Sequence, residues 1–298
     1  MNKKEYKEVC KLTLDIYSGI LFNNLEFEKG KDNKINYNFS CEEFTLLKEK
    51  YHLEEIGGRG SEFKKGKRLL HYFASRLTHS SWYDNHIPCN SLDLLEYSLN
   101  NPEQGINCLN KSKILEECCL ALGIYSRRVC IMPYSPYDFD NHVVVEIYDR
   151  KMDKWLMLDP TSDGYFVDEN KTPLSLLEIR EKFAKNEFVT YVRSIDSLKD
   201  LKKLKEKYVD ANSYICKNLF YFNIDQDSTF GYSGNDLVFV PKNYSIKEKM
   251  IANTKYRINN LPKEYEDFIP ELKEKLLKLE DYIEDERTNI EEMIKRPY

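Results

Sequence analysis

The sequence predicts an α+β fold in which helices pack on an antiparallel β-sheet and a further helix is added at the C-terminus. Three observations support this class. Apolar residues after Cys108 recur at helical spacing and stop at Gly123, a residue typical of helix ends. Two strand patterns, at 141–148 and 155–159, flank a short turn, as in an antiparallel hairpin. Two later runs rich in β-forming residues are expected to extend the same sheet, at 214–224 and 236–241.

Local patterns place the remaining elements. An amphipathic pattern predicts a helix at 3–22, alternating polarity indicates a hairpin at 25–39, and Ser40 suits the N-cap of a helix at 41–51. Further helices are expected at 69–77, 92–99, 174–183 and 197–208, with a strand at 189–193. Three regions result: an N-terminal helical and hairpin extension at 1–60, a core with its late strands at 61–245, and an acidic amphipathic helical tail at 246–298.

The tail carries an apolar seam with 4–3–4 spacing, which predicts one long helix at 264–295. Glu286 interrupts this seam, and residues 261–298 hold twelve Asp or Glu against seven Lys or Arg. The first interpretation is that the helix packs along the domain of the same chain. The alternative is a coiled coil with a partner or with a second copy of the chain. The apolar positions are Leu272, Leu276, Leu279, Ile283, Ile290 and Met293.

Composition narrows the function classes. The formal net charge is −5 and the basic run at 64–68 is short, so we expect no nucleic-acid partner. No apolar run approaches the ~18–20 residues of a membrane helix, and the charged start has no signal-peptide core. We therefore expect no membrane contact and a cytoplasmic location. Eight cysteines without a Cys-x-x-Cys pair argue against structural zinc, and no cofactor is implied.

Cys108 is the first candidate for a chemical role. It lies in the first turn of a predicted helix, where unpaired backbone N–H groups and the positive end of the helix dipole favour a thiolate. The thiolate is the nucleophilic form of the side chain. Taken alone, a cysteine on a helix is more often a small buried residue, as we expect for Cys118 and Cys119. The partners of Cys108 therefore decide its role.

A histidine and an aspartate arrive on the predicted hairpin. If Tyr148 pairs with Trp155, then His142 lies opposite Thr161, and Asp159 is its diagonal neighbour on the same face. The two backbones would be roughly 7–8 Å apart, a distance that two side chains can span. A register shift of one residue would place them on opposite faces.

A cysteine, a histidine and an aspartate in this arrangement suit nucleophilic acyl transfer. His142 would take the thiol proton, Asp159 would orient the imidazole, and Cys108 would attack a carboxamide to form a thioester. Hydrolysis by water, as in a peptidase or amidase, is the first expectation. Amine transfer to a protein glutamine is the alternative. A catalytically idle domain that binds a peptide or protein in the same cleft is the rival from another class.

In order and spacing, these segments resemble the transglutaminase-like superfamily. The matching parts lie within 105–161: Gly105-Ile106-Asn107-Cys108, the step Leu122-Gly123-Ile124-Tyr125-Ser126-Arg127, the strand that His142 opens, and Leu158-Asp159-Pro160-Thr161. The resemblance implies a papain-like fold with helices packed on an antiparallel sheet. It also implies a triad at Cys108, His142 and Asp159 and a peptide or protein substrate.

The oxyanion donor is less clear from the sequence. Members of this superfamily use the backbone N–H of the cysteine together with an upstream side chain. Here Trp82 is the first choice, and its competitors are Asn85, His79 and His86. The chain departs from the family pattern at Val144, where an aromatic residue is common, and at Asn107, where the residue is usually apolar.

Overall fold

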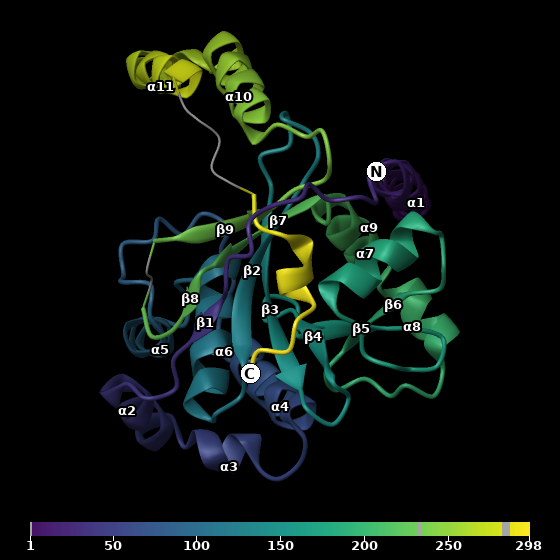
Figure 1. Ribbon diagram of the computed structural model, residues 1–298, viewed down its shortest axis with the longest axis vertical. Coiled ribbons are helices and arrows are strands. Elements are labelled where there is room, and N and C mark those ends of the chain that lie inside the picture. The colour runs from purple at the N-terminus through teal and green to yellow at the C-terminus, as the bar shows by residue number, and fades with distance from the viewer. Residues whose placement is uncertain (1, 232–233, 282–286) are drawn as a thin grey trace.

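The protein is built on a five-stranded antiparallel sheet with the strand order β4–β3–β2–β7–β9 (Figure 1). The computed structural model describes residues 2–231, 234–281 and 287–298. The predicted α+β class is confirmed, and so is the expectation that the late strands extend the sheet. The strands are β2 (Ser126–Met132), β3 (His142–Asp149), β4 (Lys154–Leu158), β7 (Tyr221–Asp225) and β9 (Asp236–Phe239).

Helix α6 (Cys108–Ala121) packs on β2 and β3 at the centre of the fold. The Asn107 side chain caps its start by accepting a hydrogen bond from the N–H of Asn110. After its end, Gly123 takes a φ of +70°, which glycine adopts at no steric cost. Residues 110–121 are all buried. They are covered by α2 (Glu42–Tyr51), α4 (Glu62–Ala74) and α5 (Ser91–Asn100), with α3 (Leu53–Gly57) joining the first two.

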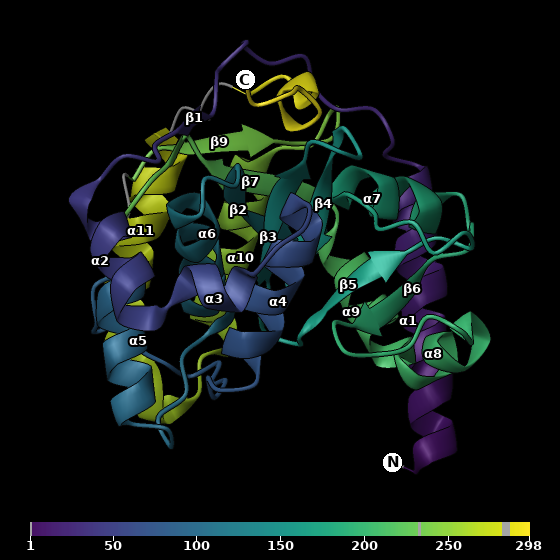
Figure 2. The ribbon, with the colours of Figure 1, turned by 90° about the horizontal axis from the view of Figure 1, so that it is seen from below.

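Alternate residues of the central strands face two hydrophobic cores. Val145 and Ile147 of β3 belong to the core that α6 shares, whereas Val144 belongs to the core on the opposite face of the sheet. This alternation follows from the two-residue period of a strand. Figure 2 shows α4, α5 and α6 on one side of the sheet and the C-terminal segment on the other.

A second group of elements flanks the β4 edge of the sheet (Figure 1). Strands β5 and β6 form an antiparallel pair there, and a bridge between Asp159 and Gly164 links the pair to the end of β4. Helix α1 packs on α7 and α9, while α2 packs on α6, so residues 1–60 contribute to both groups. The elements are α1 (Lys3–Phe22), β5 (Gly164–Val167), α7 (Leu176–Ala184), β6 (Thr190–Arg193), α8 (Leu201–Lys207) and α9 (Val209–Asn218).

Three local predictions are wrong. Residues 25–39 do not form a hairpin, because β1 (Asn36–Tyr37) pairs in parallel with β8 (Asp227–Ser228) and Phe27 forms a bridge with Pro241. Helix α2 is preceded by Cys41 rather than capped by Ser40. The run 214–224 begins as helix α9 and becomes a strand only at β7. In the first and third cases, packing against residues distant in the sequence overrides the local pattern.

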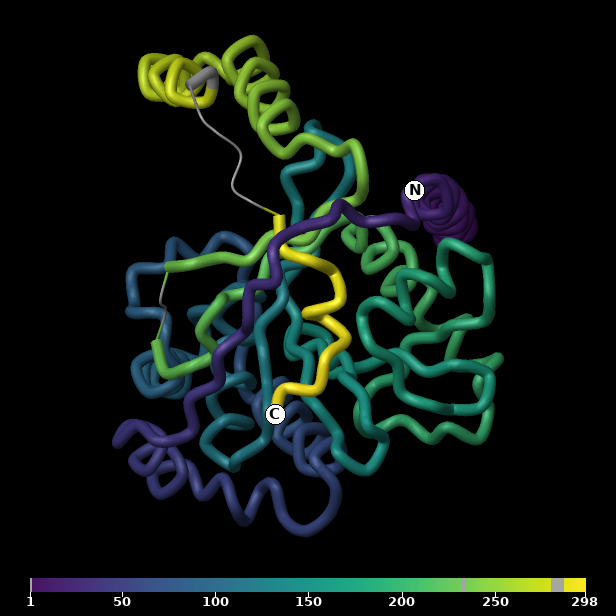
Figure 3. Tube along the Cα trace, viewed as in Figure 1, coloured from purple at the N-terminus to yellow at the C-terminus, as the bar shows by residue number. Residues whose placement is uncertain are grey.

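The C-terminal tail is not one helix. Helices α10 (Ile246–Asn260) and α11 (Ile269–Asp281), with the 3-10 helix η1 (Lys263–Phe268) between them, pack together and project from the body (Figure 3). By Thr288 the chain lies on the sheet again, where the Thr288 N–H donates to the Val238 carbonyl (2.9 Å). The expected helix at 264–295 is therefore wrong. Two positions of its seam, Ile283 and Glu286, lie outside the described residues.

Residues 287–298 cover the face of the sheet opposite α6. Arg127 Nη2 donates to the Met293 carbonyl (2.7 Å), and Trp155 Nε1 donates to the Lys295 carbonyl (3.0 Å). The Met293 side chain, in the 3-10 helix η2 (Ile290–Met293), is buried in the core on this face. The apolar residues at the end of the tail therefore pack on the sheet rather than continuing a helical seam.

Replacing Met293 with alanine should lower the free energy of unfolding by about 2–5 kcal/mol, because it leaves a cavity in this core. The matched control is Leu277→Ala on α11, where the leucine is 64% exposed. That change should alter stability by less than about 0.5 kcal/mol. Urea denaturation measures both variants, and equally small effects would contradict a structural role for the C-terminal segment.

Candidate active site

Helix α6 and strand β3 bring Cys108 and His142 together. Ser112 lies one turn after Cys108, and its hydroxyl donates to the carbonyl of Val143 (2.8 Å), the residue that follows His142. This buried bond holds the start of the helix beside the start of the strand. The Cys108 side chain lies close enough to the His142 ring to raise the pKa of that histidine, and both residues line one cleft. The sequence-predicted nucleophile and base therefore meet.

The hairpin register is the one that the sequence predicts. Tyr148 pairs with Trp155, and the imidazole Nε2 of His142 lies 3.1 Å from Oδ1 of Asp159. Because Nε2 faces Asp159, Nδ1 is the ring nitrogen left for Cys108. The same Asp159 oxygen accepts hydrogen bonds from the N–H groups of Thr161 (3.0 Å) and Ser162 (3.4 Å), which fix the carboxylate after the strand ends. The three predicted residues thus lie together at one site, where a hydrogen bond joins His142 to Asp159 and Cys108 lines the same cleft as His142.

The His142–Asp159 pair is charged at neutral pH. Burial by itself lowers the pKa of His142, but the charge and hydrogen bond of Asp159, together with Cys108, raise it to about 10. Burial by itself raises the pKa of Asp159, yet His142 and the two backbone N–H groups bring it below its usual value. The histidine therefore stabilises the fold fully below its usual pKa of 6.5 and loses this contribution as the pH rises through about 10.

Two tyrosines enclose the pair. The Tyr191 hydroxyl donates to Asp159 Oδ2 (3.4 Å), and the Tyr214 ring packs edge-on against the His142 imidazole with centroids 5.4 Å apart. Tyr191 fits there because residue 164 is glycine, since a β-carbon at Gly164 would lie 2.2 Å from the Tyr191 ring. Sequence reasoning missed both tyrosines: Tyr191 lies in the strand pattern at 189–193, and Tyr214 begins the run at 214–224 that was expected to be a strand.

Cys108 and His142 line a cleft of about 460 Å³, which we call the Cys108 cleft. Asp159 lies behind His142 and is 2% exposed. Most of the lining is polar, so the cleft suits a polar substrate such as a peptide backbone. The other lining residues are His79, Ser81, Asn85, Asn107, Leu109, Cys130, Phe139, Asp140, Asn141, Val143, Thr161, Ser162 and Tyr214.

The structure distinguishes among the residues considered as oxyanion donors. Trp82, the first choice from the sequence, is 94% exposed and does not line the cleft. Asn85 does line it, and its Oδ1 accepts a hydrogen bond from the side chain of Asn107 (3.0 Å), the residue before Cys108. This bond directs the Asn85 carbonyl to Asn107 and leaves its NH₂ group as the available donor.

The two histidines of the same segment have other partners. His79 lines the cleft, but its ring contacts the Ser81 hydroxyl (3.2 Å) and the backbone of Ile106. Burial, then the nearby Lys111 and His142, lower the pKa of His79, which keeps its ring neutral. His86 contacts Asp84 and does not line the cleft. Among the four candidates, the geometry therefore favours Asn85, a choice that sequence order alone could not make.

Comparison with protein-family models, with curated proteins and with solved structures gave no match to this chain. The chemistry of the site therefore has to be argued from its geometry. In the described part of the chain, no cluster of three or more His, Cys, Asp or Glu residues is placed to hold a metal ion. Nor do those residues include a helix long and apolar enough to cross a membrane.

Proposed function

We propose that the protein is a cysteine-nucleophile hydrolase that cleaves a peptide or amide bond through a thioester intermediate. The observation that carries this proposal is the hydrogen-bonded pair of His142 and Asp159 beside Cys108 in one cleft. A helix that presents the cysteine at its start, packed on an antiparallel sheet that presents the histidine, is also the arrangement of a papain-like, transglutaminase-like core. We infer that 105–161 forms such a core.

In the first chemical step, the Cys108 sulfur attacks the carbonyl carbon of the substrate and the carbonyl oxygen becomes an oxyanion. His142 takes the proton of the Cys108 thiol for this attack, and its pKa near 10 keeps the resulting imidazolium protonated at neutral pH. The C–N bond then breaks as the imidazolium gives its Nδ1 proton to the leaving amine. The products of this step are the thioester and a free amine.

Water resolves the thioester in the second step. Neutral His142 takes a proton from the water, the hydroxide adds to the acyl carbon, and the C–S bond breaks to release a carboxylic acid and the Cys108 thiolate. Asp159 remains ionised throughout and holds the ring by its hydrogen bond to Nε2. The polar lining of the Cys108 cleft, including Asn141 and Thr161, gives water access to the acyl carbon.

Two N–H donors are available for the oxyanion. The N–H of Cys108 is in the first turn of α6 and has no carbonyl partner within the helix. The NH₂ group of Asn85 is the second donor, and the Asn107 side chain sets its orientation. Because the helix and the capping residue fix both groups before substrate binds, little reorganisation is needed when charge develops on the oxygen.

Cys108→Ala should abolish cleavage of a mixed peptide library, measured by mass spectrometry of the new termini. Asp159→Asn should slow cleavage by about 10²–10⁴-fold with the fold intact, because asparagine still accepts the backbone bonds but no longer stabilises the imidazolium. Cys41→Ala, at a partly exposed cysteine before α2, is the matched control and should leave the rate unchanged. Cleavage that persists in Cys108→Ala, or no cleavage in the unmodified protein, would contradict the proposed function.

A second comparison tests the oxyanion donors. Asn85 has a φ of +58°, which glycine also adopts, so Asn85→Gly removes the amide with little backbone strain. Losing one such donor should lower kcat by about 10²–10³-fold. Trp82→Ala, three residues earlier, should leave kcat within about twofold, because this side chain is exposed outside the cleft. The reverse order of effects would restore Trp82 as the donor.

A further inference from the structure

A second cavity adjoins the Cys108 cleft on the side of Asp159. Its volume is about 550 Å³, and Ser162 and Tyr214 line both spaces, so the two lie next to each other. Tyr191 connects them chemically, because its ring lines the second cavity while its hydroxyl contacts Asp159. A substrate held at Cys108 can therefore extend a neighbouring group into this second cavity, which we call the tyrosine pocket.

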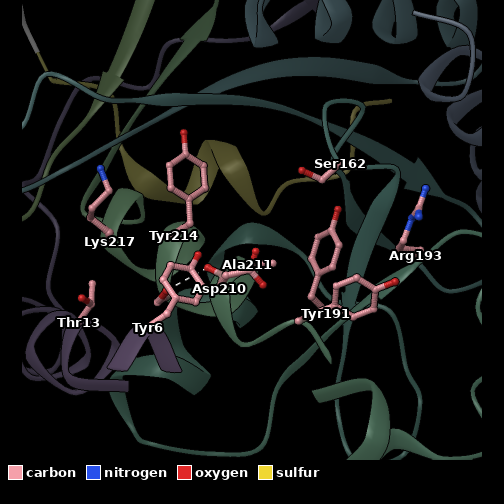
Figure 4. A pocket seen from close by; sticks show the side chains of 11 residues that line it. Tyr6, Thr13, Ser162, Tyr191, Arg193, Asp210, Ala211, Tyr214 and Lys217 are labelled. Atoms are coloured by element: carbon pink, nitrogen blue, oxygen red, sulfur yellow. Dashed lines mark hydrogen bonds between the residues drawn. The ribbon is translucent and has the colours of Figure 1, made fainter. Parts of the chain in front are cut away.

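The walls of the tyrosine pocket are aromatic, and most of their hydroxyls already have partners. Tyr208 donates to Asp196 (2.5 Å), and Tyr214 contacts Asp140 (3.2 Å). Tyr191 is 1% exposed, so the rings of Tyr6, Tyr208 and Tyr214 are the ones left to contact a ligand, and the faces of aromatic rings attract cations. Figure 4 shows the rings around Asp210, with Lys217 and Arg193 toward opposite sides of the view. The four tyrosines are Tyr6, Tyr191, Tyr208 and Tyr214.

The charged residues that line the tyrosine pocket differ in whether they have a partner of opposite charge. Both of its cations have carboxylate partners: Lys217 Nζ lies 2.7 Å from Asp138 and 3.7 Å from Asp140, and Arg193 lies 3.5 Å from Asp163. Asp210 is the one carboxylate in the lining, and no cation pairs with it among the residues that the structure describes. Neighbouring carboxylates therefore neutralise both cations of the lining, whereas Asp210 has no cationic partner among the described residues, so the group left to attract a ligand is negatively charged.

We propose that the tyrosine pocket is a specificity subsite that binds the cationic side chain of a residue near the scissile bond, with Asp210 as its counter-ion and the tyrosine rings around its methylene stem. This proposal rests on the proposed function, because it takes the bound group to be part of a peptide held at Cys108. A lysine side chain has the required chemistry: an apolar stem that packs on rings and an ammonium group that pairs with a carboxylate.

The proposal is tested with sets of capped hexapeptides. Within a set the peptides carry lysine, norleucine or glutamate at the same position, and the sets differ in which position of the peptide is varied. Their binding to full-length Cys108→Ala protein is measured by fluorescence anisotropy, so that no turnover interferes. At one position the lysine peptide should bind about tenfold more tightly than the norleucine peptide. Asp210→Asn should remove this preference. Glu42→Gln, which removes a carboxylate from the first turn of α2, is the matched control and should retain it.

Equal binding of lysine and norleucine peptides at every position, tighter binding of glutamate, or absence of binding would overturn the subsite. So would a lysine preference that survives Asp210→Asn. Turnover of the same peptides by the unmodified protein separates the two proposals. Cleavage that needs Cys108 but shows no lysine preference overturns the subsite alone, whereas a lysine preference that needs Asp210 without any cleavage overturns the hydrolase alone.

Discussion

Charged side chains on a helix that is buried on every side must find partners within the protein, and this constraint organises the structure around α6. Lys113, Glu116 and Glu117 are completely buried, and leaving any one of them unpaired would cost several kcal/mol. Lys113 Nζ contacts Glu116 (3.0 Å), Glu117 (3.3 Å) and the carbonyl of Thr229 (2.9 Å). The helix therefore carries its own ion pairs into the core.

The two carboxylates also accept backbone hydrogen bonds from other elements, and these bonds hold α6 in place within the fold. Glu116 accepts the N–H of Arg128 on β2, and Glu117 accepts the N–H groups of Ser91, at the start of α5, and of Gly231. Lys111, nearer the start of the helix, donates to the carbonyl of Leu77 (2.9 Å) and so fixes the chain just before His79 enters the cleft. Cys108 is thus placed by a rigid element, as the role of nucleophile that we propose for it requires.

The parts of the site that the sequence predicts correctly have local signals. Helix α6 follows from its apolar spacing and Gly123, and the pairing of Tyr148 with Trp155 follows from a short turn, which also fixes the position of Asp159 relative to His142. Asn85 and Tyr191 reach the site through the contacts of other segments. The sequence offers Asn85 only as one of four candidates and indicates Tyr191 only as part of a strand. The tail prediction failed for the same reason, because Met293 packs on a sheet whose strands lie far earlier in the chain.

The central claim is that Cys108, His142 and Asp159 form one charged and connected set. Titration of the His142 ring tests this claim most directly, and NMR of isotope-labelled protein follows the titration. The carboxylate should keep the ring protonated through pH 8, with a midpoint near pH 10. In Asp159→Asn protein, burial should dominate and the midpoint should fall to the usual 6.5 or lower. A midpoint near 6.5 in the unmodified protein, unchanged by Asp159→Asn, would contradict the account.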